Sequence, residues 1–77
     1  PSAIDGFVMN YGITYCKKVI ADLERIEQQM FDELDHGFDL YSDEWRHLCN
    51  YRRYLKQFQR EKELGLPPSY RPDFHGE

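Results

Sequence analysis

The residues best suited to chemistry are three histidines, His36, His47 and His75, and two cysteines, Cys16 and Cys49. Structural zinc sites are built from closely spaced pairs such as CxxC, CxxH or HxxxH, and the chain has none of these. His47 and Cys49 are two positions apart, so they diverge on a helix. A Cys–His pair would also need a third orienting group and an oxyanion hole for catalysis. We therefore expect no metal site, no catalytic site and no cofactor, and we interpret both cysteines as reduced core thiols.

An acidic stretch between residues 31 and 45 is the second candidate for chemistry, because it contains six carboxylates and no Lys or Arg. A calcium-binding EF-hand loop would need Gly37 at its sixth position. That alignment places Leu34 where a carboxylate is required and Asp43 in place of the bidentate Glu. The pattern therefore predicts a solvated acidic turn, with an acidic patch for a basic partner as the alternative.

The third candidate is a run of aromatic and basic residues between Ser42 and Gly65. Arg52, Lys56 and Arg60 recur every four residues and form one helical stripe. This stripe either pairs with the acidic first helix or binds a phosphate or carboxylate, and both possibilities stay open. The aromatic content exceeds what one helical seam can hide, and Tyr, Trp and Arg are enriched at binding hot spots. The residues expected to bind a partner are Trp45, Tyr51, Arg52, Arg53, Tyr54, Lys56, Phe58 and Arg60.

Two helices are expected to position these residues. The three–four spacing of apolar residues predicts a helix over 13–35. A second helix is predicted over 43–64, because Ser42 can cap its start and Gly65 can end it. The short connection makes the two helices antiparallel neighbours, with Gly37 in the left-handed conformation that ends the first one.

The flanking segments lack helical signals. Residues 1–12 contain two glycines and read as an apolar arm that docks on the helices or on a neighbouring subunit. Residues 66–77 contain three prolines and read as an extended tail. The fold class is therefore all-α, an antiparallel two-helix hairpin over 13–65, with an apolar arm and a Pro-rich tail. Because one seam buries little apolar surface, we expect self-association into a helical bundle, most simply a homodimer.

The length and composition of the chain restrict the classes of function that it can have. The 77 residues allow one small domain, and the net charge of −4 disfavours nucleic acid as the main partner. No apolar run approaches the roughly 20 residues that span a bilayer, and two cysteines do not make a disulfide framework, so we expect a cytoplasmic protein. The architecture resembles small helical-hairpin proteins such as the plasmid RNA-binding regulator Rop and type III secretion co-chaperones, and phages and mobile elements encode many such chains. We predict a protein–protein interaction module, that is, an adaptor, assembly chaperone or inhibitor. The alternative is a nucleic-acid-binding hairpin regulator that acts as a dimer.

Overall fold

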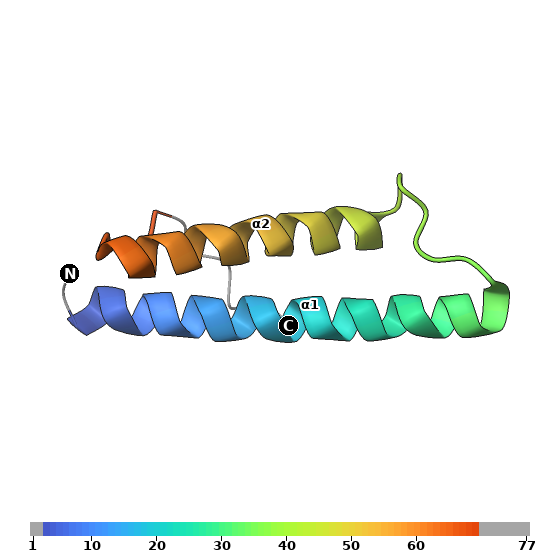
Figure 1. The fold of residues 1–77 in the computed structure, drawn as a ribbon, viewed down its shortest axis with the longest axis horizontal. Helices are drawn as coiled ribbons and strands as arrows, with labels where there is room; N and C mark the ends of the chain where they lie inside the picture. Colours follow the sequence, from blue (N-terminus) through green and yellow to red (C-terminus); the bar gives the residue numbers. More distant parts are fainter. Residues whose placement is uncertain (1–2, 70–77) are drawn as a thin grey trace.

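The computed structural model describes residues 3–69 and consists of two antiparallel helices, α1 (Ala3–Leu34) and α2 (Asp43–Leu64) (Figure 1). No strand occurs in this range, so the predicted all-helical hairpin is confirmed. Within the same range, neither helix combines the length and the apolar character needed to cross a membrane. Of the predicted tail over 66–77, the part after residue 69 lies outside the described residues.

The predicted N-terminal arm is wrong, because α1 already begins at Ala3 and includes residues 3–12. The two glycines that suggested a break both lie inside the helix. At Gly12 the reason is packing: a Cβ atom built there would lie 2.7 Å from Cζ of Phe58. Met9, Gly12 and Cys16 are all buried and follow the spacing of one helical face. The missing side chain of Gly12 therefore allows α1 to approach α2 closely at Phe58.

The ends of α2 follow the predicted signals. Ser42 has an extended backbone, and its side-chain oxygen accepts a hydrogen bond from the Trp45 N–H at 3.1 Å. Gly65 adopts the left-handed conformation with φ 70°. The N–H of Gly65 donates to the Lys62 carbonyl at 3.2 Å and that of Leu66 to the Glu61 carbonyl at 2.9 Å, the pattern of a Schellman cap. Local sequence therefore fixes both ends of this helix.

The end of α1 differs from the prediction. The left-handed residue is Asp35, with φ 67°, and not Gly37. Asp tolerates this conformation better than most residues, and its N–H donates to the Phe31 carbonyl at 3.1 Å. Gly37 is needed for a different reason, since a Cβ atom there would lie 2.6 Å from the Glu27 carboxylate. That carboxylate accepts a hydrogen bond from the Phe38 N–H at 3.0 Å and holds the loop against α1.

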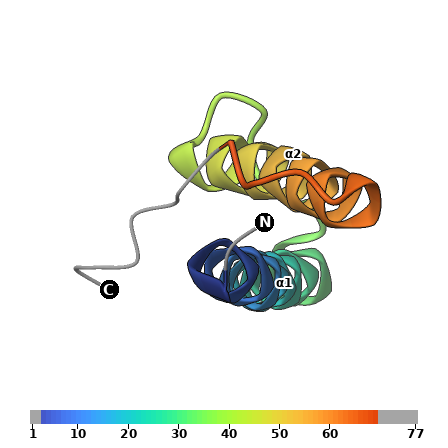
Figure 2. The same cartoon turned by 90° about the vertical axis from the view of Figure 1, so that its left-hand side faces the viewer.

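The two helices differ in length, 32 residues for α1 and 22 for α2. Figure 1 shows that α1 extends past the start of α2 and that the loop spans this overhang. Viewed end-on, the described chain is a single pair of helices with axes slightly inclined to each other (Figure 2). The core is correspondingly small. Within residues 3–69 its buried apolar residues are Met9, Cys16, Phe38, Leu48 and Phe58.

Candidate protein-binding surface

The structure divides the predicted partner-binding residues among several places. Phe58 is 1% exposed and packs with Met9 and Cys16, so it belongs to the hairpin core. Tyr51 and Tyr54 are half-buried and pack against that cluster along one flank of the seam.

The basic residues lie on another side of α2. Arg53 is two positions from Tyr51 and therefore points to a different face of the helix. Arg52, Arg53 and Lys56 line a shallow depression together with the half-exposed Cys49. The predicted continuous aromatic–arginine patch is thus split, and its basic part forms a separate surface.

Part of this basic surface is used inside the hairpin. Arg52 donates to the Glu24 carboxylate at 2.9 Å, which is an ion pair between α2 and α1. Both side chains are about half exposed, so the pair contributes little stability. Arg53 donates to the side chain of Asn50 within α2, and Arg60 is exposed. The predicted pairing with the first helix therefore holds for Arg52.

Trp45 is half-buried at the loop end of α2. It lines a second depression of about 370 Å³ with Leu40, Tyr41 and Cys49. The Tyr41 ring beside it is 92% exposed. Because Cys49 lines this depression and also the one at Arg52, Trp45 and the basic residues form one continuous side of the hairpin. We call this side the Trp45 face and define it by Trp45, Cys49, Arg52, Arg53 and Lys56.

The opposite flank carries a row of aromatic rings, of which only Tyr51 and Tyr54 were predicted to bind a partner. Neighbouring ring centroids are 6.0 Å apart for Phe7 and Tyr11, 6.4 Å for Tyr11 and Tyr15, 5.9 Å for Tyr15 and Tyr51, and 5.5 Å for Tyr51 and Tyr54. The row therefore runs along α1 and crosses to α2 at Tyr15. The first three rings are four residues apart, which places them on one helix face. This four-residue spacing could have revealed the row from the sequence. It was overlooked because Phe7 and Tyr11 lie in residues 1–12, which were predicted to be a non-helical arm.

A groove follows the aromatic row where the two helices meet. It has a volume of about 610 Å³. Lys18 and Asp22 lie on its rim and pair with each other at 3.0 Å. We call this the aromatic groove and define it by its lining residues, Tyr11, Tyr15, Lys18, Val19, Asp22, Leu23, His47 and Tyr51.

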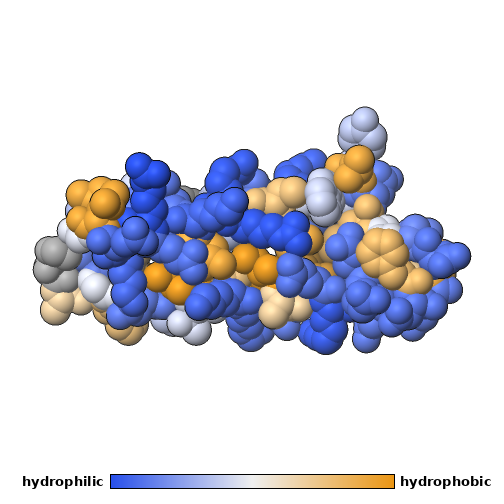
Figure 3. Space-filling view, in the orientation of Figure 1, coloured by the Kyte–Doolittle hydropathy of each residue, from blue (hydrophilic) through white to orange (hydrophobic). Residues whose placement is uncertain are grey.

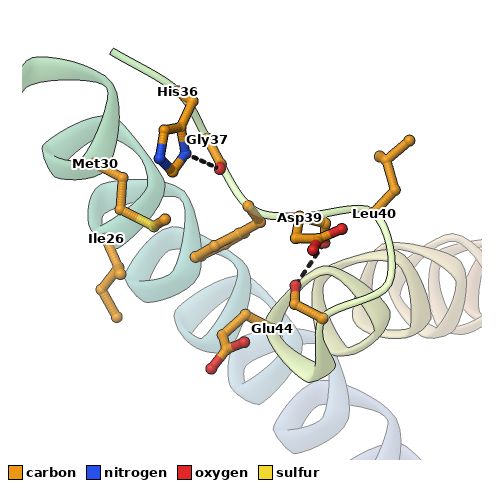
Figure 4. A pocket seen from close by; sticks show the side chains of 9 residues that line it. Ile26, Met30, His36, Gly37, Asp39, Leu40 and Glu44 are labelled. Atoms are coloured by element: carbon orange, nitrogen blue, oxygen red, sulfur yellow. Dashed lines mark hydrogen bonds between the residues drawn. The ribbon is translucent and has the colours of Figure 1, made fainter. Parts of the chain in front are cut away.

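A hollow of about 700 Å³ continues from the groove beneath the loop. Ile26 lies one helical turn beyond Asp22, and Glu44 lies three residues before His47, so groove and hollow adjoin on the same flank. Figure 4 shows Ile26 and Met30 projecting from α1 on one side of the hollow and Glu44 projecting from the start of α2 on the other. This hollow is where the overhang of α1 lacks a partner helix.

Apolar side chains at both ends of the hairpin are exposed. Ile4 and Phe7, near the start of α1, are each 68% exposed, and Leu64 and Leu66 at the end of α2 are also exposed. Figure 3 shows one broad side of the molecule, where hydrophilic side chains cover both helices and apolar surface is visible mainly along the seam and at the ends. On this side, the apolar surface is thus concentrated along the seam and at the two ends of the hairpin.

The two thiols have different environments. Cys16 is fully buried in the core, and burial raises the pKa of its thiol to about 11. Cys49 is half-exposed beside Arg52. The prediction that both thiols are buried is therefore confirmed for Cys16 and wrong for Cys49, which lies on the outer flank of α2.

Glu61 is a buried carboxylate, 3% exposed, that ties the chain after α2 back onto the helix. Its Oε2 atom accepts hydrogen bonds from the Ser69 N–H at 2.9 Å and from the Gln57 side chain at 3.1 Å. Burial acts to raise the pKa of this carboxyl, but the hydrogen bonds from Ser69 and Gln57 outweigh it, so the pKa lies below its usual value. Oε1 has no hydrogen-bond partner within the described part of the chain. The carboxylate therefore fixes residues 66–69 against α2.

Between residues 3 and 69, no group of three or more His, Cys, Asp or Glu side chains is arranged to hold a metal ion. The features that remain for function are the aromatic groove with its adjoining hollow and the Trp45 face. Comparisons of the chain with protein-family models, with curated proteins and with solved structures find no match.

Proposed function

We propose that this chain is a small non-catalytic protein-interaction module and that the aromatic groove is its binding surface. The observation that carries the proposal is the row of five rings from Phe7 to Tyr54, which spans both helices beside a groove of about 610 Å³. Aromatic side chains supply a large contact area at a low cost in conformational entropy, and they dominate binding hot spots. The row is solvent-exposed at its start, where Phe7 is 68% and Tyr11 42% exposed, and its other three rings are half-buried. Such a surface suits an adaptor, an assembly chaperone or an inhibitor.

The Trp45 face is the second surface that supports this function. It combines an indole ring with Arg53 and Lys56, neither of which forms an ion pair with another described residue. Arg and Trp are both enriched at protein interfaces. The free thiols of Cys16 and Cys49 are compatible with the reducing conditions of the cytoplasm, where we place the protein.

Nucleic-acid binding has weaker support. Arg52, the central residue of the basic stripe, is paired with Glu24 at 2.9 Å, and the net charge is −4. A surface that neutralises phosphates would need several free cations on one face, and its affinity would fall steeply with salt. We therefore keep this function as the second candidate.

Selection from a phage-displayed random peptide library on sparsely immobilised protein tests the proposal. We expect enriched apolar or aromatic peptides whose binding is lost in Tyr15→Ser and retained in the matched variant Tyr41→Ser. Both tyrosines are near the surface, but only Tyr15 lines the groove. If enriched peptides bind Tyr15→Ser as well as they bind the unmodified protein, or if no peptide is enriched, the groove is not a protein-binding surface.

A further inference from the structure

We infer that the Trp45 face binds an acidic segment of another protein, and that this segment places an aromatic or apolar side chain beside Trp45. The inference rests on the proposed function, because it takes the chain to be a protein-interaction module. It concerns a different surface from the aromatic groove, and it names the chemistry of the partner.

The charges of the chain are unevenly distributed along α2. Residues 45–60 contain five basic residues and no Asp or Glu, although the net charge of the whole chain is −4. All five are exposed, and at about 100° per residue they fall within an arc of roughly 120° on the side of α2 opposite the buried Phe58. At about 1.5 Å per residue, this arc is roughly 21 Å long. We call it the basic strip and define it by Arg46, Arg52, Arg53, Lys56 and Arg60.

Three of these cations, Arg53, Lys56 and Arg60, form no ion pair with another residue between 3 and 69. Arg46 and Arg52 already pair with carboxylates of the hairpin, at 3.4 and 2.9 Å. The other three are spaced three and four positions apart, so they are neighbours on the helix surface. Like charges at these spacings repel each other and destabilise a helix. A partner that supplies carboxylates would remove this repulsion on binding.

Aromatic and apolar side chains adjoin the basic strip at the loop end of α2. Trp45, Leu40 and Tyr41 line the depression of about 370 Å³, and Leu40 and Tyr41 are 68% and 92% exposed. Cys49 lines this depression and also the one formed by the basic residues, so the two adjoin. Trp and Tyr beside Arg is the composition enriched at binding hot spots. A partner segment can therefore place a ring in the depression and its carboxylates on the strip.

This surface fits protein carboxylates better than a nucleic-acid backbone. Asp43 and Glu44 lie in the first turn of α2, and Glu63 lies three residues beyond Arg60, so the strip is flanked by carboxylates at both ends. A nucleic-acid duplex carries one negative charge about every 1.7 Å and would meet these carboxylates if it followed the strip. A short acidic segment needs only two or three cations, and an Arg can hold a carboxylate through two parallel hydrogen bonds.

Selection from a random peptide library at low salt, with elution at high salt, tests the inference. Salt releases peptides that are held by charge, whereas apolar peptides in the aromatic groove stay bound. We expect the eluted peptides to be enriched in Asp and Glu and to share an aromatic or apolar residue. The absence of any eluted peptide, or enrichment without an excess of acidic residues, would overturn the inference.

Charge reversal shows where a synthetic copy of the most enriched peptide binds. In fluorescence anisotropy, the double variant Arg53→Glu, Lys56→Glu should bind it at least about tenfold more weakly. The matched control is Lys17→Glu, Lys62→Glu, which makes the same change in net charge at exposed residues outside the Trp45 face. Its affinity should stay within about twofold, because distant charges are screened. Equal weakening in both variants would show that net charge, and not this face, attracts the peptide.

Two further variants keep the test decisive. Circular dichroism shows whether the charge-reversed protein is helical; if it is not, Arg53→Gln and Lys56→Gln, which only neutralise the charges, should each weaken binding severalfold. Tyr41→Ser removes an exposed ring beside Trp45 and should weaken the acidic peptide as well. If the acidic peptide binds all three variants as tightly as the unmodified protein, it does not lie on the Trp45 face.

A nucleic-acid comparison and the groove variant separate the possible outcomes. If a short single-stranded DNA or a duplex RNA binds more tightly than the selected peptide, and Arg53→Glu, Lys56→Glu abolishes that binding, the Trp45 face binds nucleic acid and the inference is wrong. If apolar peptides require Tyr15 but no acidic peptide is recovered, the proposed groove stands and this inference fails. If acidic peptides require Arg53 and Lys56 but no peptide requires Tyr15, the Trp45 face is the binding surface and the groove is not.

Discussion

Replacing Gly12 by alanine should destabilise the hairpin, although alanine is the better helix former. The new Cβ atom would lie 2.7 and 2.8 Å from two ring carbons of Phe58, closer than real Cβ contacts come. The ring is 1% exposed and enclosed by the core, so it cannot turn away without disturbing its neighbours. The clash therefore has to be accommodated by moving the helices apart or by forcing the ring off its preferred rotamer.

The magnitude follows from two opposing contributions. Alanine in place of glycine in a helix interior gains about 1 kcal/mol. Overpacking a closed core costs about 1–3 kcal/mol, and the cost lies in the upper part of that range when the obstacle is a rigid ring. We expect the free energy of unfolding of Gly12→Ala to fall by about 1–2 kcal/mol. Gly6→Ala is the matched control, because a Cβ there meets nothing within 4 Å. It should raise the same free energy by about 0.5 kcal/mol.

Urea denaturation followed by far-ultraviolet circular dichroism measures both variants, at one fixed protein concentration so that any self-association contributes equally. The double variant Gly12→Ala, Phe58→Leu removes the ring carbons that clash. It should be more stable than the sum of the two single changes by about 1 kcal/mol or more, as contacting residues are not additive. If Gly12→Ala is stabilised as much as Gly6→Ala, the helices do not approach closely at this point and the packing described above is wrong.

Three further predictions concern the helix cap, the thiols and the buried carboxylate. Ser42→Ala should lower the free energy of unfolding by about 1 kcal/mol, because it removes the acceptor at the start of α2, and an unchanged urea midpoint would refute this cap. In the folded protein a thiol reagent should modify Cys49 much faster than Cys16, whose buried thiol has a pKa of about 11; equal rates in native buffer, read by mass spectrometry of the two peptides, would contradict the burial. Glu61→Gln should cost about 1 kcal/mol at neutral pH, since a charged acceptor of the Ser69 N–H becomes neutral. Because the folded-state pKa of Glu61 is lowered, its contribution is present above the ordinary value of 4.5 and is lost as the pH falls below it. The stability gap between wild type and Glu61→Gln should therefore close in acid, and a gap that stays constant would argue against the ionised carboxylate.

The second helix was predictable because interactions between residues close in sequence determine where it begins and ends. Ser42 supplies a side-chain acceptor at the start, and Gly65 supplies a left-handed backbone at the end. Both effects act within a few residues, so they are visible in a short stretch of sequence. The first ten residues of α1 were not predictable in the same way. Gly12 is required by Phe58, 46 positions later in the chain, and no local pattern contains that information.

The binding surface was predicted less well than the fold. Tyr51 and Tyr54 were identified as unusual, but their neighbours were taken to be the arginines of the same helix. In the structure Tyr51 packs beside Tyr15 of α1, and Arg52 reaches Glu24 on the other flank. A single helix shows which residues share a face, but only the pairing of two helices shows which faces are joined. The sequence therefore indicated the residue types at the surface and not their grouping.

The unequal lengths of α1 and α2 imply that the hairpin is not equally stable along its axis. Around Gly12 and Phe58 both helices contribute to a closed core, so backbone amides there should exchange with solvent only when the whole hairpin unfolds. The last turns of α1 lie under a loop that is held by the hydrogen bond from the Phe38 N–H to Glu27 and by the buried Phe38 ring, and we expect them to fray before the core opens. Local opening at that end would enlarge the hollow without disturbing the core. A ligand or partner that fills the hollow would then slow amide exchange in residues 26–34 far more than elsewhere, which makes the end of α1 a natural reporter of binding.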